Sequence, residues 1–202
     1  MKKMLLSAAA VLGLMAGAAQ AVTYTVDVTA ATVTNPNLGL SASARILSDT
    51  GPQTFNGATY SFDLINEGDS ATIDVFALTS FEPTLDANDT NPLAASAVFD
   101  FGGSIGAITL TGITAGVLGP VPGGLATFIS DAIRVSPTLA IVISIADTAF
   151  ATDGTGYVFG NAGKGNVTAT FTLAAVPLPA TLPMALLALG GLAAAARRRK
   201  AV

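Results

Sequence analysis

Carboxylates are almost the only side chains in this 202-residue chain that could do chemistry. The chain has no histidine and no cysteine, which excludes Ser-His-Asp triads, cysteine nucleophiles and ordinary zinc sites. A pair of carboxylates can hydrolyse glycosidic bonds, and Glu67 and Glu82 are the candidates for that role. Both stand in polar, turn-like segments, and no strand-based cleft with aromatic platforms is evident. We therefore expect no enzymatic activity.

A second chemical candidate is the acidic segment 86–91, Asp-Ala-Asn-Asp-Thr-Asn. Oxygen donors recur at alternating positions, Asp86, Asn88 and Thr90, as they do in loops that bind Ca²⁺. An EF-hand would need glycine at its sixth position and glutamate at its twelfth, where this chain has asparagine and alanine. The sequence thus leaves open a looser Ca²⁺ site, but an Asn/Asp turn is the default interpretation. We expect no other cofactor.

The segments that must position these residues have the pattern of β-strands. Val22, Tyr24, Val26 and Val28 alternate with polar residues, so one face of that segment is apolar. Similar alternation or a short apolar run recurs along the chain, with turn-forming residues between the runs. These runs lie at 60–64, 73–77, 98–101, 105–110, 139–145 and 167–173. The pattern predicts an all-β fold, an antiparallel β-sandwich over residues 22–175.

The alternation also predicts which side chains face the core. The expected inward set is Tyr24, Val26, Phe62, Leu64, Ile73, Val75, Val98, Ile141, Ile143 and Phe171. Phe76 is expected on the face opposite Val75. Residues 126–133 fit either a short helix or an edge strand, and the glycine-rich residues 154–165 are typical of a long hairpin connection.

The charge of this domain excludes one class of partner. All 13 acidic residues lie between Asp27 and Asp153, whereas Arg45, Arg134 and Lys164 are the only basic residues in 22–175. The resulting formal charge is −10. Nucleic acids are bound mainly through cations that neutralise phosphates, so we expect no nucleic-acid partner. An acidic surface instead favours solubility or the binding of cations.

The N-terminus has the pattern of an export signal. Met1-Lys2-Lys3 is positively charged, residues 4–16 are apolar, and Ala19-Gln20-Ala21 forms a small-x-small cleavage site. Residues 1–21 are therefore predicted to be a helical signal peptide. It would direct the chain to the Sec translocon and be removed by signal peptidase, so that the mature protein begins at Val22.

The C-terminus has three parts in a fixed order. The motif Val176-Pro177-Leu178-Pro179-Ala180 precedes the apolar segment 182–196 and the basic cluster Arg197-Arg198-Arg199-Lys200. As a helix, the apolar segment spans about 22 Å, short of the roughly 30 Å hydrocarbon core of a bilayer. The sequence predicts a marginal transmembrane helix whose basic end stays in the cytoplasm. A buried helix of the core is the alternative.

This tail, residues 176–202, resembles the PEP-CTERM protein-sorting domain in its VPLPA-CTERM variant. Pro183, early in the helix, departs from the usual pattern. The resemblance implies transient retention in the inner membrane of a Gram-negative bacterium and cleavage near the motif by an exosortase. The domain would then reach the cell surface or extracellular matrix, in association with exopolysaccharide or biofilm. We expect a structural or adhesive protein; a carbohydrate- or ligand-binding module and, as the weaker option, a carboxylate-dependent hydrolase are the alternatives.

Overall fold

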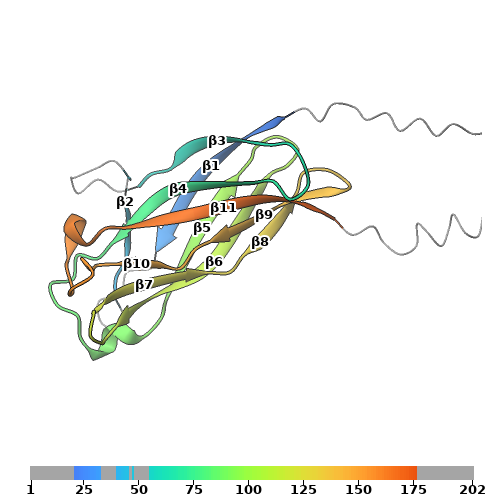
Figure 1. The fold of residues 1–202 in the computed structure, drawn as a ribbon. Coiled ribbons are helices and arrows are strands. Elements are labelled where there is room, and N and C mark those ends of the chain that lie inside the picture. Colours follow the sequence, from blue (N-terminus) through green and yellow to red (C-terminus); the bar gives the residue numbers. More distant parts are fainter. Residues whose placement is uncertain (1–20, 33–39, 46, 48–54, 177–202) are drawn as a thin grey trace, which may run out of the picture.

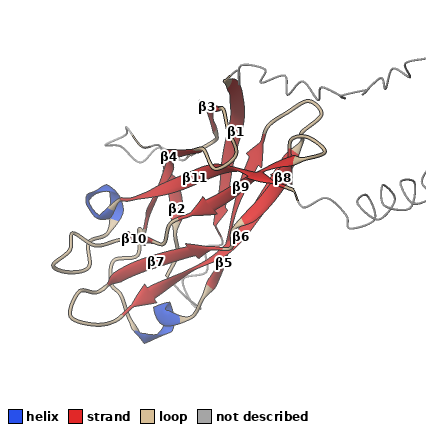
Figure 2. Ribbon diagram, turned by 45° about the vertical axis from the view of Figure 1, so that its right-hand side comes forward, coloured by secondary structure: helices blue, strands red, loops and turns tan. Residues whose placement is uncertain are grey.

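The computed structural model describes residues 21–32, 40–45, 47 and 55–176, which form eleven β-strands and two short 3-10 helices (Figure 1). Helix is confined to η1 (Ala87–Thr90) and η2 (Gly160–Gly163) within these residues (Figure 2). Every strand pair is antiparallel, and the strands form two curled sheets. The predicted all-β class is therefore confirmed. The predicted signal helix and transmembrane helix lie outside the described residues.

The first sheet has six strands. Its order is β10 (Thr148–Phe150), β7 (Gly123–Phe128), β6 (Ala107–Val117), β5 (Leu93–Asp100), β1 (Val22–Thr32) and β3 (Ala58–Leu64). The second sheet has five strands. Its order is β2 (Ser43–Arg45), β4 (Ser70–Thr79), β11 (Gly165–Ala175), β9 (Leu139–Ile145) and β8 (Asp131–Arg134).

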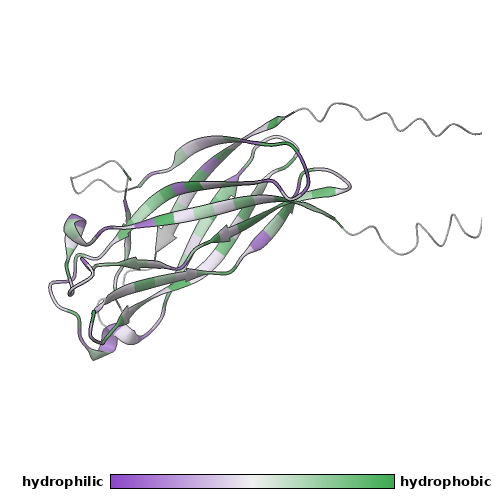
Figure 3. Cartoon of the chain, in the orientation of Figure 1, coloured by the Kyte–Doolittle hydropathy of each residue, from purple (hydrophilic) through white to green (hydrophobic). Residues whose placement is uncertain are grey.

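One hydrophobic core joins the two sheets. The rings of Phe62 in β3 and Phe171 in β11 stack with their centroids 4.4 Å apart, and Phe99 in β5 meets Phe171 edge-on at 5.7 Å. Each such aromatic pair stabilises a fold by roughly 0.5–1.5 kcal/mol beyond the area it buries. Hydrophobic and hydrophilic residues alternate along the strands around this core (Figure 3). The arrangement is compatible with the predicted two-layer sandwich.

Most of the expected inward set is buried. Its core members are Tyr24, Val26, Phe62, Leu64, Val75, Ile141, Ile143 and Phe171, and Ile73 packs partly buried against them. Val98 was predicted wrongly, because Ala97 and Phe99 face the core and Val98 is half-buried on the other side of β5. The sequence held the signal for the correct phase, because Ser96 and Asp100 are polar and lie on the same side of the strand as Val98.

β4 changes the direction of its side chains at a β-bulge. Val167 of β11 pairs with Phe76, and Thr168 pairs with Asp74, so Val75 is the extra residue. As a result, both Val75 and Phe76 belong to the core, and the prediction that Phe76 faces away from Val75 is wrong. Strict alternation cannot anticipate an inserted residue, since a bulge shifts every later side chain by one position.

Two connections cross between the sheets. Residues 126–133 contain no helix: β7 ends at Phe128 in the first sheet, and β8 begins at Asp131 as an edge strand of the second. The segment 154–165 was predicted as a hairpin, which is wrong because β10 and β11 belong to different sheets. Glycine-rich composition marks a turn, but it does not show to which sheet the chain returns.

Candidate functional site

β11 leads from the core to the tail. It lies between β4 and β9 in its sheet, and its inward residues are all buried. These residues are Val167, Ala169, Phe171 and Leu173, as the alternation predicts. The strand ends at Ala175, so no loop separates it from the first residue of the predicted motif, Val176.

Hydrogen bonds hold this exit strand up to that first residue. The backbone N–H of Val176 donates to the carbonyl of Thr138 at 2.8 Å. The turn between β3 and β4 also forms two hydrogen bonds with this strand. Gly68 N–H donates to the Leu173 carbonyl at 2.7 Å, and Leu173 N–H donates to the Asp69 carbonyl at 2.9 Å. The residue at which the motif begins, Val176, is therefore held in a fixed position on the domain.

The first and the last strand reach the same end of the domain. The start of β1 and the end of β11 lie at one end of the domain (Figure 1). Consistently, Val22 pairs with Leu64, and the turn that follows Leu64 contacts Leu173. We call this the exit end. Ala21 is described, whereas Ala19, Pro177, Leu178, Pro179, Ala180, segment 182–196 and Arg197, Arg198, Arg199 and Lys200 lie outside the described residues.

The end of the chain matches a known family model. Residues 175–200 match the model described as PEP-CTERM protein-sorting motif. The chain carries a PEP-CTERM sorting motif. The motif implies an exported protein that passes through a membrane-anchored stage and is processed by an exosortase. No curated protein and no solved structure is significantly similar to this chain.

A membrane span is a separate question from the motif. In the ranges that the structure describes, no helix has both the length and the hydropathy needed to cross a bilayer.

The predicted carboxylate pair is not brought together. Glu67 is exposed in the turn before β4, at the exit end, whereas Glu82 follows β4. The strand between them has 10 residues and spans about 30 Å. Glycosidase carboxylates lie about 5–9.5 Å apart. Glu67 and Glu82 therefore cannot act as such a pair.

The three residues predicted as a loose Ca²⁺ site form a helix cap. An oxygen of the Asp86 carboxylate accepts from Asn88 N–H at 3.0 Å, and the Asp89 carboxylate accepts from Asp86 N–H at 2.7 Å. The Thr90 hydroxyl donates to the Ala87 carbonyl at 2.9 Å. Within the described ranges, no group of three or more carboxylates is arranged to hold a metal ion. These contacts are those of the turn that was the default interpretation.

Sequence reasoning missed that Asp89 is buried beside Glu82. Only 1% of Asp89 is exposed, and it sits against β6, where Gly116 leaves room for it. Burial raises its pKa above the ordinary value, and the nearby negative charges of Glu82 and Asp86 raise it further, while the bond from Asp86 N–H lowers it. No sequence signal separates Asp89 from the exposed carboxylates around it.

The outward side of four strands of the first sheet carries no charge over most of its length. This uncharged face is formed by Ala94, Ser96, Val98, Thr109, Thr111, Ile113, Ala115, Val117, Leu125, Thr127, Ile129 and Ala149. Large apolar side chains on it are open to solvent, with Ile113 45% and Ile129 70% exposed. Contiguous apolar surface of this kind marks interaction sites on soluble proteins.

The same sheet is polar on its other half. The outward side chains of β1 and β3 form a hydrogen-bonded ladder in which Thr23 bonds to Asp63, Thr25 to Ser61, and Thr59 to Asp27. The contrast between the two halves makes the uncharged face a distinct surface.

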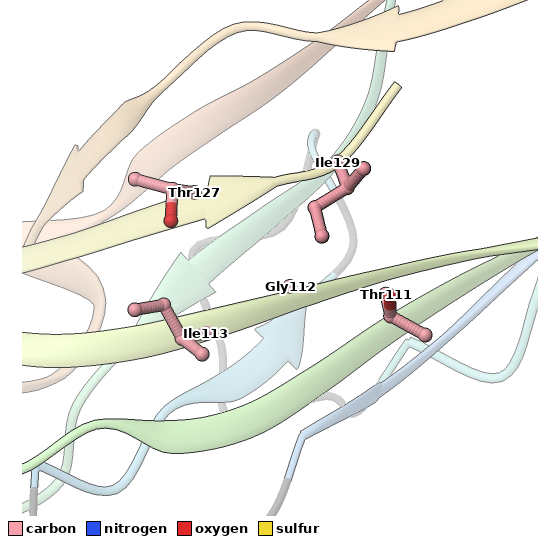
Figure 4. Close-up of a pocket in the computed structure, with 5 residues that line it drawn as sticks. All are labelled: Thr111, Gly112, Ile113, Thr127 and Ile129. Carbon is pink, nitrogen blue, oxygen red and sulfur yellow. The ribbon is translucent and has the colours of Figure 1, made fainter. Parts of the chain in front are cut away.

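A shallow pocket of about 360 Å³ lies on the uncharged face (Figure 4). It is lined by Thr111, Gly112, Ile113, Thr127 and Ile129. Gly112 is required there, because a Cβ atom at this position would collide with the Thr127 carbonyl and come within 2.7 Å of the Phe128 ring. The lining contains no charged group, so the pocket suits an apolar or neutral partner.

Two exposed phenylalanines lie at the end of the domain opposite the exit end, near η2. Phe81 is 46% exposed and Phe159 is 61% exposed, the highest exposures among the ten phenylalanines. A bond of 2.5 Å from Gly160 N–H to the Ser80 carbonyl joins their segments. The Arg45 guanidinium lies 4.5 Å from the centroid of the Phe81 ring. We call this pair the phenylalanine tip.

Proposed function

We propose that this protein is a VPLPA-CTERM-type exosortase substrate and that its β-sandwich domain serves as a non-catalytic structural or adhesive component of the cell surface or extracellular matrix. The match at residues 175–200 supports the processing step. The observation that carries the adhesive role is the uncharged face. A domain with a formal charge of −10 repels acidic polymers and other copies of itself.

Electrostatics favours contact through this face. Repulsion between exposed charges is screened only beyond a Debye length of about 8–10 Å. On the uncharged face, Ile113, Leu125 and Thr127 can approach a partner without bringing carboxylates together. A face of threonine, alanine and isoleucine side chains can pack against a neutral polymer or an apolar protein surface.

The experiment measures retention in the matrix. The source strain would express the wild-type protein, Leu125→Lys or Ile113→Lys, with Ser61→Lys on the polar half as the matched control. We expect the face variants to shift from the matrix pellet to the soluble extracellular fraction, and the control to stay with wild type. Equal retention of all four proteins would remove the face from the proposal. A strain without exosortase should keep wild type in the membrane fraction.

The phenylalanine tip favours one alternative, a carbohydrate- or ligand-binding module. Exposed aromatic rings can pack against the apolar faces of sugars, and the segments that carry Phe81 and Phe159 are joined by the hydrogen bond from Gly160 N–H to the Ser80 carbonyl. Affinity electrophoresis with neutral polysaccharides would test it. Phe159→Ala should abolish any retardation, whereas Ile129→Ala on the uncharged face should not. The hydrolase alternative has lost its candidate pair, since Glu67 and Glu82 lie at opposite ends of β4.

A further inference from the structure

Asp89 is a buried carboxyl group with one unused oxygen. Oδ2 accepts a hydrogen bond from Asp86 N–H at 2.7 Å, whereas Oδ1 is buried without a hydrogen-bond partner. With 1% of the residue exposed, water cannot replace that partner. A buried ionised carboxylate is strongly unfavourable unless something positive compensates it. A proton or a cation at Oδ1 would therefore stabilise the buried side chain of Asp89.

A second carboxyl group lies beside it. The side chain of Glu82 is within hydrogen-bonding reach of the Asp89 side chain. Its position is fixed, because Oε1 accepts from Ser41 N–H at 2.5 Å and the Glu82 carbonyl accepts from the Tyr157 hydroxyl at 2.7 Å. Asp86 adds a third negative charge nearby.

The two basic side chains described near this region are engaged in other contacts. The Arg45 guanidinium lies over the Phe81 ring, and Lys164 Nζ donates to the Leu47 carbonyl at 2.6 Å. Neither of these two contacts places a positive charge at the carboxyl pair.

More unpaired oxygens belong to residues that adjoin the pair. The backbone N–H of Ser41 donates to Glu82, and the Ser41 hydroxyl is buried without a hydrogen-bond partner. The side-chain carbonyl of Asn88, the residue before Asp89, is also buried without one. Carboxylate, amide and hydroxyl oxygens are the ligands that hard divalent cations prefer. Ser41 Oγ and Asn88 Oδ1 are both oxygens of this kind.

We propose that Glu82 and Asp89 bind a divalent cation of the Ca²⁺ class, with Ser41 Oγ, Asn88 Oδ1 and water completing the oxygen shell. This site differs from the one predicted from sequence, since Asp86 and Thr90 serve their own turn. With two carboxylates, its affinity belongs in the range of extracellular modules, with a Kd of about 10⁻⁴–10⁻³ M. The cation would tie the segment before β2 to the loop that carries η1.

The test compares the cation with a shared proton. Melting temperatures of the exported protein would be measured at neutral pH in millimolar CaCl₂ and in chelator. We expect Ca²⁺ to raise the melting temperature of wild type by several degrees, since a ligand stabilises only the folded state that binds it. Asp89→Asn should lose this response and yet be at least as stable as wild type in chelator. Its amide can still accept from Asp86 N–H and can donate to Glu82.

Glu82→Gln provides a second variant, and Asp131→Asn, at an exposed carboxylate of β8, is the matched control that should keep the full response to Ca²⁺. Calorimetric titration with CaCl₂ should show one site in wild type and in this control, and none in the other two variants. A Ca²⁺ response that survives in Asp89→Asn overturns the assignment. So does a wild type that ignores Ca²⁺ but gains stability as the pH falls from about 8 to 5, because the pair then shares a proton. Neither outcome affects the matrix-retention assay.

Discussion

The hydroxyl group of Tyr60 in β3 donates a hydrogen bond to the carbonyl oxygen of Val75 in β4. The two strands belong to different sheets, so this bond crosses from one layer to the other. Val75 is the extra residue of the β-bulge, and a bulge disrupts the ladder locally. Tyr60 thus satisfies a carbonyl at the place where β4 changes the direction of its side chains.

Replacing Tyr60 by phenylalanine keeps the ring and removes the donor. We expect Tyr60→Phe to lower the free energy of unfolding by about 1–2 kcal/mol, because the Val75 carbonyl is left without its partner. Urea unfolding followed by circular dichroism measures this change. Tyr24→Phe, in the same core, is the control. An effect of Tyr60→Phe no larger than that of the control would show that the bond contributes little.

The same tyrosine makes stability depend on alkaline pH. Burial raises the pKa of Tyr60 above its ordinary value of 10.0, and the negative charge of Asp74 raises it further. The raised pKa means that ionisation is less favourable in the folded state. The associated stability is fully present below pH 10 and is lost as the pH rises through the raised pKa. Tyr60→Phe should therefore show a shallower alkaline decline, which unfolding curves across that range would measure.

Asp69 should make the exit end sensitive to acid. Hydrogen bonds from the N–H groups of Asn66 and Ile65 lower the pKa of its carboxyl group below the ordinary value of 3.8. The stability they supply is present above that value and is lost as the pH falls through the lowered pKa. Leu173 N–H donates to the Asp69 carbonyl, so its protection from hydrogen exchange, relative to the intrinsic exchange rate at the same pH, should fall at acid pH. In Asp69→Ala this protection should be low at neutral pH as well.

A pair of neighbouring substitutions tests the register of β9. Ile143 is fully buried, whereas Val142 next to it is only half-buried on the other face of the strand. Ile143→Asp places an unpaired charge in the core, and we expect it to destabilise the domain by more than about 4 kcal/mol. Val142→Asp should cost much less. Similar losses in thermal unfolding would contradict the assignment of the inward face.

The sorting motif can be tested without changing hydropathy greatly. We expect Pro179→Ala to leave the protein uncleaved in the inner membrane, because the substitution removes the restriction that proline places on the backbone of a motif that an enzyme must recognise. The check is fractionation and blotting in a host with an intact exosortase. Equal amounts of shortened, extracellular wild type and variant would show that Pro179 is not recognised. A full-length wild type that stays in the membrane would contradict processing itself.

Local patterns in the sequence predicted the strands better than the way in which they are assembled. The run 139–145 coincides with β9, and Val167, Ala169, Phe171 and Leu173 are buried as expected. The alternation rule assumes that each residue of a strand pairs with one residue of its neighbour. It therefore placed Phe76 on the wrong face at the bulge, where Val75 is an extra residue. It could not show that β10 and β11 lie in different sheets, because that depends on contacts distant in sequence. The burial of Asp89 has the same origin, since it is set by packing against Gly116 of β6.

The place of β11 between two neighbours has a mechanical consequence. While the tail holds the protein in the membrane, any force on the domain enters through Ala175 and runs along β11. Pulling this strand lengthwise must break its ladders with β4 and β9 together, since both pair with it along most of its length. An edge strand such as β8 would instead peel from a single neighbour. The domain is thus attached to its tail through a strand that resists shear, so a pull on the tail loads the part of the fold that is hardest to pull out.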